Sequence, residues 1–349
     1  MAKNLVLLFD GTGNEPNLHR ETNVLRFFDM MERSENQVIW YDPGVGTEGS
    51  TKAVTALGRK LTRIGGLAFG YGLKDNVALG YRFLIDNYEE GDRIFLLGFS
   101  RGAYTARALA GFVYQIGLLR RGHDNMIPYA FKLFWWHHTK KVKEATWEEA
   151  NHFSRQFCRE DFRRRVDRGL HHVGVWDTVN ATGILRGRLV LPWTAHMPMA
   201  NTMSHAVSID EKRRPYRPTL LATDAGGIER SDFKEVWFAG VHSDVGGTFL
   251  PDHRLADITF EWSAAQAIDH GLIVDEEAFG AFRRQPASNA DGEVHNMGWK
   301  WWLTTLFFHR RIPSDAVIHE SVRIKMDGEA SYVPRLPANV SWEPWEHQA

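Results

Sequence analysis

The stretch Ile94–Gly111, IFLLGFSRGAYTARALAG, decides the fold class of this 349-residue chain. An apolar run reaches Gly98, one serine follows between two glycines, and an alanine-rich segment comes next. Continuous apolar runs of this kind are typical of parallel strands that are covered on both faces. The pattern Gly-x-Ser-x-Gly between a strand and a helix is typical of a nucleophile elbow, a sharp turn that lifts a serine hydroxyl above the sheet. We therefore expect an α/β fold in which Ser100 is a nucleophile.

The same order of apolar run, loop and helix recurs along the chain. Each apolar run ends in a loop of small or acidic residues, and helical patterns lie between the runs. The predicted strands are 4–9, 37–41, 93–97, 172–176 and 235–241, and the predicted helices are 76–88, 102–116 and 255–270. This alternation predicts an α/β-hydrolase-like, mostly parallel sheet flanked by helices, with functional groups at the carboxyl ends of the strands.

Two segments interrupt the alternation. Residues 119–170 are polar, basic and helix-like, whereas residues 283–312 are irregular and rich in tryptophan. The sequence contains no internal repeat and no low-complexity linker. We therefore predict a single domain over residues 1–349, with cap-like insertions at about 119–170 and 283–312.

The composition excludes some classes of protein and indicates the cellular compartment. A formal net charge of −1 gives no bulk attraction to nucleic acid. Cys158 is the single cysteine, so an intrachain disulfide is impossible and a reducing compartment fits. The apolar run Leu5–Phe9 is too short for a signal peptide, and no stretch approaches the roughly 20 apolar residues that span a bilayer. We expect a cytoplasmic protein, or one exported by a route without a cleaved signal peptide.

A serine nucleophile needs a histidine base, and the histidine needs an orienting carboxylate. Asp177 and His242 each follow a predicted strand, and with Ser100 they keep the order Ser-Asp-His of α/β-hydrolases. We predict these three as the catalytic triad. An alternative triad with the same chain order combines Ser100 with Asp244 and His319.

The oxyanion of a tetrahedral intermediate needs backbone N–H donors. Arg101 follows the serine at the start of the predicted helix, which suits its N–H to this role. The glycine-rich loop after the first strand offers a second donor, from Gly11 or Thr12. This chemistry requires no cofactor and no metal.

Two other classes of function stay open on the sequence. Asp10, Asp177, His242 and Asp244 are oxygen and nitrogen ligands at predicted strand ends, so a metal-assisted phosphoesterase is one alternative. The other is a non-catalytic module that binds a partner through a tryptophan-rich face.

Two aromatic stretches are candidates for contact with a lipid surface. Trp299, Trp301 and Trp302 precede a basic end, and residues 129–141 have a similar character. Tryptophan favours bilayer interfaces, and basic neighbours favour anionic lipid. Packing in a lid or in the core is the alternative interpretation of both stretches.

Several motifs together resemble one family. They are LFDGTGN (8–14), GFSRGAYTARALAG (98–111), VGVWDTV (173–179), VWFAGVHSDVGG (236–247) and LADITFEW (255–262). Over roughly residues 3–275 the chain resembles the catalytic domain of type VI secretion phospholipase effectors of the first lipase class. The resemblance implies an α/β-hydrolase fold, hydrolysis of phospholipid acyl esters, and Ser100, Asp177 and His242 as the triad. It also implies immunity or adaptor proteins as partners.

Overall fold

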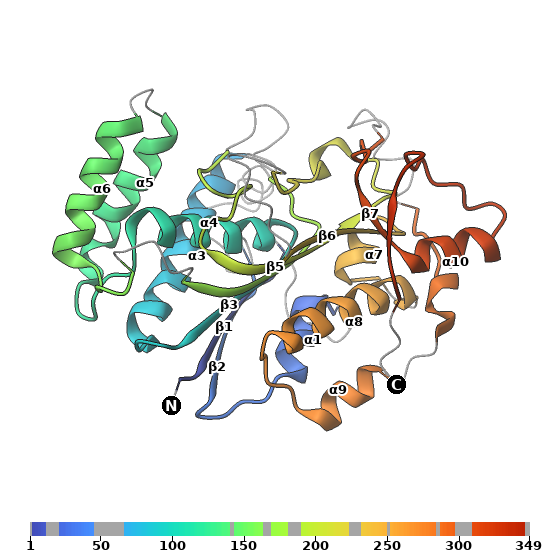
Figure 1. The fold of residues 1–349 in the computed structure, drawn as a ribbon, viewed down its shortest axis with the longest axis horizontal. Helices are drawn as coiled ribbons and strands as arrows, with labels where there is room; N and C mark the ends of the chain where they lie inside the picture. Colours follow the sequence, from blue (N-terminus) through green and yellow to red (C-terminus); the bar gives the residue numbers. More distant parts are fainter. Residues whose placement is uncertain are drawn as a thin grey trace, which may run out of the picture.

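The computed structural model describes residues 2–11, 21–44, 66–139, 143–162, 169–180, 190–222, 232–249, 252–283, 287–296 and 309–345. These residues form one eight-stranded sheet in the order β2-β1-β3-β4-β5-β6-β7-β8, and every neighbouring pair of strands is parallel (Figure 1). The strands are β1 (Asn4–Phe9), β2 (Gln37–Asp42), β3 (Arg93–Phe99), β4 (Leu170–Trp176), β5 (Ala200–Ser208), β6 (Phe233–Phe238), β7 (Val317–His319) and β8 (Ser341–Glu343). The expected α/β fold with a parallel sheet is confirmed.

Helices lie on both faces of the sheet (Figure 1). The α-helices are α1 (Asn23–Met30), α3 (Gly66–Asn87), α4 (Ser100–Ile116), α5 (Ile127–Thr139), α6 (Lys143–Phe157), α7 (His242–Gly246), α8 (Arg254–Asp269), α9 (Glu276–Arg283) and α10 (Glu320–Gly328). The short 3-10 helices are η1 (Asp124–Met126), η2 (Arg214–Tyr216) and η3 (Ala287–Asp291). In the part of the chain that the structure describes, none of the helices is both long and apolar enough to cross a bilayer.

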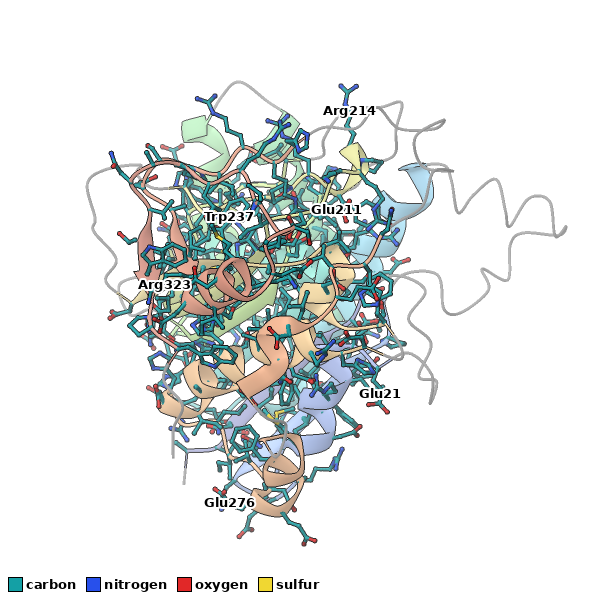
Figure 2. All side chains as sticks on the ribbon, turned by 90° about the vertical axis from the view of Figure 1, so that its right-hand side faces the viewer. Glu21, Glu211, Arg214, Trp237, Glu276 and Arg323 are labelled. Carbon is teal, nitrogen blue, oxygen red and sulfur yellow. The ribbon has the colours of Figure 1, made fainter. Side chains whose placement is uncertain are left out.

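The strand sequences explain why both faces are covered. All six residues of β1, NLVLLF, are buried. Because strand side chains alternate between faces, Leu5 and Leu7 pack with α3 and α4, while Val6 and Leu8 pack with α1 and α8. In Figure 2 the side chains fill the space around the sheet, and Trp237 of β6 is 1% exposed.

The strand order places a topological switch point next to the start of α4. β1 pairs with β2 on one side and with β3 on the other, so the direction of the chain through the sheet reverses next to β3. In parallel α/β sheets, ligands bind outside the carboxyl ends of the strands at such a reversal. Ser100 is the residue that directly follows β3.

The first predicted insertion, 119–170, is helical in its described part. It contains η1, α5 and α6, and the last two lie side by side next to α4 (Figure 1). Phe131 and Phe134 of α5 pack on Phe112 of α4, with ring centroids 4.4 and 5.3 Å away, so this part of the aromatic stretch 129–141 is core. Half of the second insertion, 283–312, lies outside the described residues, including 297–308.

Candidate active site

Ser100 occupies a sharp turn between β3 and α4. Its φ of +59° lies in the left-handed region, which residues with a side chain rarely adopt. The flanking glycines are required by close backbone contacts. A Cβ at Gly102 would lie 2.1 Å from the Phe9 carbonyl oxygen, and one at Gly98 would lie 2.8 Å from the Gly102 carbonyl carbon. The GxSxG pattern thus folds here as the turn that the sequence predicts.

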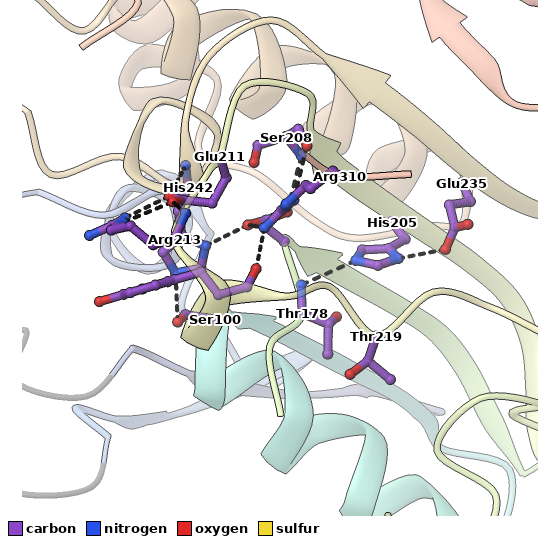
Figure 3. Close-up of polar contacts among 12 residues, drawn as sticks. Ser100, Thr178, His205, Ser208, Glu211, Arg213, Thr219, Glu235, His242 and Arg310 are labelled. Carbon is purple, nitrogen blue, oxygen red and sulfur yellow. Dashed lines mark hydrogen bonds and ion pairs between the residues drawn. The ribbon is translucent and has the colours of Figure 1, made fainter. Parts of the chain in front are cut away.

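The three predicted triad side chains form one hydrogen-bonded chain, and Figure 3 labels Ser100 and His242 in it. The Ser100 hydroxyl lies 2.7 Å from His242 Nε2, and His242 Nδ1 lies 2.5 Å from Asp177 Oδ2. All three residues are buried, and they come from the ends of β3, β4 and β6. With Nδ1–H donating to the carboxylate, Nε2 is left as an acceptor for the serine hydroxyl. In this arrangement a serine can act as nucleophile, a histidine as general base and an aspartate as the acid that orients it.

The imidazole of His242 is held on several sides. The ring of Phe99 lies 4.7 Å from it and that of Tyr216 lies 4.8 Å from it, centroid to centroid. Its backbone N–H donates to Glu211 at 3.2 Å. A Cβ at Gly246 would lie 2.0 Å from the ring of Phe99, so this glycine permits the close packing. The orientation of the imidazole is therefore fixed by these contacts.

Burial and nearby charges set the protonation of the site. Burial lowers the pKa of the His242 imidazole, and the hydrogen bond and charge of Asp177 oppose this shift. Burial pushes the pKa of Asp177 upward, but the charge of Arg310 and the hydrogen bond from His242 outweigh it and hold that pKa well below its usual range. The pair is therefore poised as neutral imidazole and ionised carboxylate near neutral pH.

The sequence patterns did not point to Arg310. Its guanidinium makes two bonds to the Asp177 carboxylate, Nη1 to Oδ1 at 2.5 Å and Nη2 to Oδ2 at 2.8 Å. It stands in an irregular segment that has neither a strand nor a helix pattern. An arginine in such a segment gives no sequence signal of its partner.

The sequence patterns also did not point to a second buried ion pair, between Arg213 and Glu211. Arg213 donates through Nε and Nη2 to the two oxygens of Glu211, at 2.8 and 2.6 Å, and its guanidinium lies 3.8 Å from the centre of the Tyr216 ring. Glu211 lies within the packed side chains in Figure 2, whereas Arg214 projects from the surface. Two carboxylates and two guanidinium groups thus surround His242, and their charges offset one another in pairs.

The predicted oxyanion donors fall in three different situations. Arg101 is the second residue of α4, so its backbone N–H lies at the positive end of that helix. Burial lowers the pKa of its guanidinium to about 10. The Gly11 N–H donates instead to the Asp10 carboxylate, at 2.5 Å. Thr12 lies outside the described residues, as do Trp299, Trp301 and Trp302.

The alternative triad is not brought together. Asp244 pairs with His295, whose Nδ1 lies 2.6 Å from Oδ1, and it accepts the Val241 N–H at 2.8 Å. His319 caps α10 and lies 2.8 Å from the Ser321 hydroxyl. None of these contacts involves Ser100.

The alternative metal set is also spread over separate partners. The Asp10 carboxylate accepts hydrogen bonds from the hydroxyls of Thr22 and Tyr41, at 2.6 and 2.8 Å. Asp177 is shared by His242 and Arg310. Within the described ranges, no group of three or more His, Cys, Asp or Glu side chains is placed to hold a metal ion.

Fold and site together define an α/β protein with a serine at a nucleophile elbow and a histidine and an aspartate hydrogen-bonded behind it. Residues 3–266 match the family model described as "T6SS, Phospholipase effector Tle1-like, catalytic domain". The chain belongs to this family, as the resemblance of its motifs predicts.

Three known proteins are similar over part of the chain. "Uncharacterized protein YEL023C" of Saccharomyces cerevisiae is 34% identical over 226 residues, which are 62% of this chain and 32% of that protein. A crystal structure of an uncharacterized protein from Pseudomonas aeruginosa shares 18% identity at a TM-score of 0.47, covering 82% of this chain and 48% of the other. The Tle1 effector bound to the VgrG spike of the type 6 secretion system shares 16% identity at a TM-score of 0.38, covering 72% and 52%. The chain thus spans about a third of the yeast protein and about half of each solved chain.

Proposed function

We propose that this protein is a serine esterase that hydrolyses carboxylic esters, with phospholipid acyl esters as the substrate class. The observation that carries the proposal is the chain of hydrogen bonds from the Ser100 hydroxyl through His242 to Asp177. The family description, which names phospholipase effectors, supports the choice of substrate.

The proposed reaction has two halves. His242 Nε2 takes the proton of the Ser100 hydroxyl as Oγ attacks the acyl carbon, and Asp177 stabilises the imidazolium that forms. The Arg101 N–H donates to the oxyanion of the tetrahedral intermediate. The alcohol leaves with the proton from His242, and an acyl-serine remains. Water then attacks the acyl-serine with His242 as base, which releases the acid and restores the serine.

A fluorophosphonate tests the mechanism without knowledge of the substrate, because it phosphonylates activated serines. We expect one adduct by intact mass on the wild type, none on Ser100→Ala, and labelling slowed by about 10³-fold or more in His242→Ala. Ser263→Ala is the matched control, since Ser263 is 3% exposed and Ser100 6%, and it should label like the wild type. No adduct on a folded wild type would overturn the proposal.

A lipid panel tests the substrate class separately. Vesicles of phosphatidylethanolamine or phosphatidylglycerol are incubated with wild type and Ser100→Ala, and released fatty acid is measured by mass spectrometry. We expect release by the wild type alone. Cleavage of p-nitrophenyl butyrate without any release from the vesicles would keep the esterase and contradict the phospholipid assignment.

A further inference from the structure

Arg310 joins the site from a part of the chain beyond the family match. The match ends at residue 266, and Arg310 precedes β7. Its side chain has 0% of its surface exposed, as does that of Asp177. A guanidinium is costly to remove from water, so its complete burial against a carboxylate calls for a specific set of partners.

The contacts of Arg310 tie two further elements to the carboxylate at the end of β4; Figure 3 labels Arg310 and Ser208. Besides its two bonds to Asp177, Nη1 donates to the Ser208 carbonyl at 2.9 Å and Nη2 donates to the Tyr216 carbonyl at 2.6 Å. The guanidinium therefore joins the end of β4, the end of β5 and η2. Tyr216 is also the residue whose ring packs on His242.

The Asp177 carboxylate is saturated by these contacts. Oδ1 accepts from Arg310 Nη1 and from the Ser208 N–H, at 2.5 and 3.0 Å, and Oδ2 accepts from Arg310 Nη2 and from His242 Nδ1, at 2.8 and 2.5 Å. A carboxylate offers about four lone-pair positions, and four donors occupy them here. Two of the four belong to Arg310, and their planar fork fixes the plane of the carboxylate.

We propose that Arg310 is a positioning residue of this active site, which locks the Asp177 carboxylate onto His242. The inference rests on the proposed function, because it assumes that neutral His242 activates Ser100. Arg310 itself lies behind the carboxylate and acts through it.

The charges around His242 decide the direction of the pH effect. Asp177 and Glu211 favour the imidazolium, Arg310 opposes it, and burial disfavours it most. Arg213 is bound to Glu211, and the charge of Asp177 acts to raise the pKa of Arg213. The same charge acts to raise the pKa of His205 on the neighbouring strand, against the effect of burial. Removing the positive charge of Arg310 removes one influence that lowers the pKa of His242, so that pKa rises. As the pH is lowered, the activity that needs neutral imidazole is then lost at a higher pH than in the wild type.

The test measures the rate of fluorophosphonate labelling from pH 5 to 9. The acidic limb of this profile is the pH range in which the labelling rate falls as His242 takes up a proton. For Arg310→Met, which keeps the length of the side chain without its charge, we expect this limb to move up by about one pH unit. For Arg310→Lys, which keeps charge without the planar fork, we expect an unmoved limb and a plateau rate lowered by about 10- to 100-fold. A merely structural arginine would change stability without producing this split.

Arg26 is the matched control. As a whole residue it is 6% exposed, as Arg310 is, and its side chain is 8% exposed. Its Nη2 lies 2.7 Å from Asp257 on the opposite face of the sheet from α4. Arg26→Met should lower the melting temperature and leave the acidic limb in place. If Arg310→Met does not fold, the lysine variant decides: a rate within threefold of the wild type overturns the inference, as does an unmoved limb in a folded Arg310→Met. A wild type without any adduct would instead overturn the proposed function.

Discussion

Ser100 holds a backbone conformation that its side chain disfavours. A left-handed φ brings Cβ close to the following carbonyl oxygen, at a cost of about 1–2 kcal/mol for a residue other than glycine. The turn is kept because β3 enters it as a buried strand and α4 leaves it against β1, so both neighbours are fixed by packing. In this strained conformation Oγ lies within hydrogen-bond distance of His242 Nε2, which links the local geometry to the proposed chemistry.

Glycine at position 100 is therefore predicted to be more stable than alanine. Neither variant carries a hydroxyl, so the comparison isolates the conformation of the backbone. We expect the free energy of unfolding of Ser100→Gly to exceed that of Ser100→Ala by about 1 kcal/mol, measured by urea denaturation. At Ser263, inside α8, we expect the opposite: Ser263→Ala should be more stable than Ser263→Gly by about the same amount, because glycine disfavours helix. Equal stabilities at position 100 would show that the turn is relaxed.

The residues at strand ends were predictable from the sequence, whereas those that hold them were not. Ser100, Asp177 and His242 each follow an apolar run, and parallel strands deliver their ends to one edge. Glu211 and Arg310 stand in irregular segments, where no periodicity indicates which residue they will meet. Their partners are set by tertiary packing alone.

The element that positions Ser100 is α4, which lies close to β1. Helix and strand approach until a Cβ at Gly102 would touch the backbone of Phe9, and backbone cannot move aside as the end of a side chain can. The predicted helix 102–116 forms as α4, two residues longer at its start. This contact sets the height of Ser100 above the sheet.

Gly102→Ala is predicted to damage both the fold and the site. Overpacking of this kind costs about 2–3 kcal/mol of unfolding free energy, and the helix start must shift, so fluorophosphonate labelling should slow as well. Gly280 in α9 is the control, because a Cβ there meets nothing within 4 Å. Gly280→Ala should stabilise by up to about 1 kcal/mol with an unchanged labelling rate. A stable, fully reactive Gly102→Ala would contradict the close contact.

Other elements show where periodicity is a poor guide. β5, with the sequence ANTMSHAVS, was not predicted because it lacks a continuous apolar run. Its polar residues are used inside the protein: buried His205 lies 2.9 Å from Glu235 and accepts the Thr178 N–H at 3.2 Å, next to Asp177 (Figure 3). A strand whose inner face carries a hydrogen-bond network resembles a loop in sequence.

At the scale of the whole molecule, the interior keeps several histidines neutral. His172, His205 and His242 are buried, and the pKa of each is lowered with burial as the largest cause. For His172 it falls to about 3, with help from the charges of His270 and His171. The ring bridges the hydroxyls of Thr202 and Ser204, at 2.9 and 3.2 Å. The neutral ring therefore has a partner for each nitrogen.

These histidines are predicted to make the fold sensitive to mild acid. An unfolded histidine takes up a proton near pH 6.5, whereas His172 stays neutral in the folded state down to about pH 3. The unfolded state thus binds more protons in this window, and stability falls as the pH falls. From pH 7.5 to 5.5, His172 alone should remove about 1 kcal/mol of unfolding free energy, and His205 and His242 act in the same direction.

Replacing His172 by glutamine should remove the part of this acid-induced loss of unfolding free energy that His172 causes. Burial raises the pKa of Asp210 and Asp244, which acts in the opposite direction, but both carboxyls are present in either protein and their effect cancels in the comparison. Urea denaturation at pH 7.5, 6.5 and 5.5 should give His172→Gln a fall smaller by about 1 kcal/mol than that of the wild type. His152 is exposed on α6, so His152→Gln should fall as the wild type does. If His172→Gln loses as much stability as the wild type, the acid sensitivity arises elsewhere in the molecule, because the buried ring then makes no contribution to it.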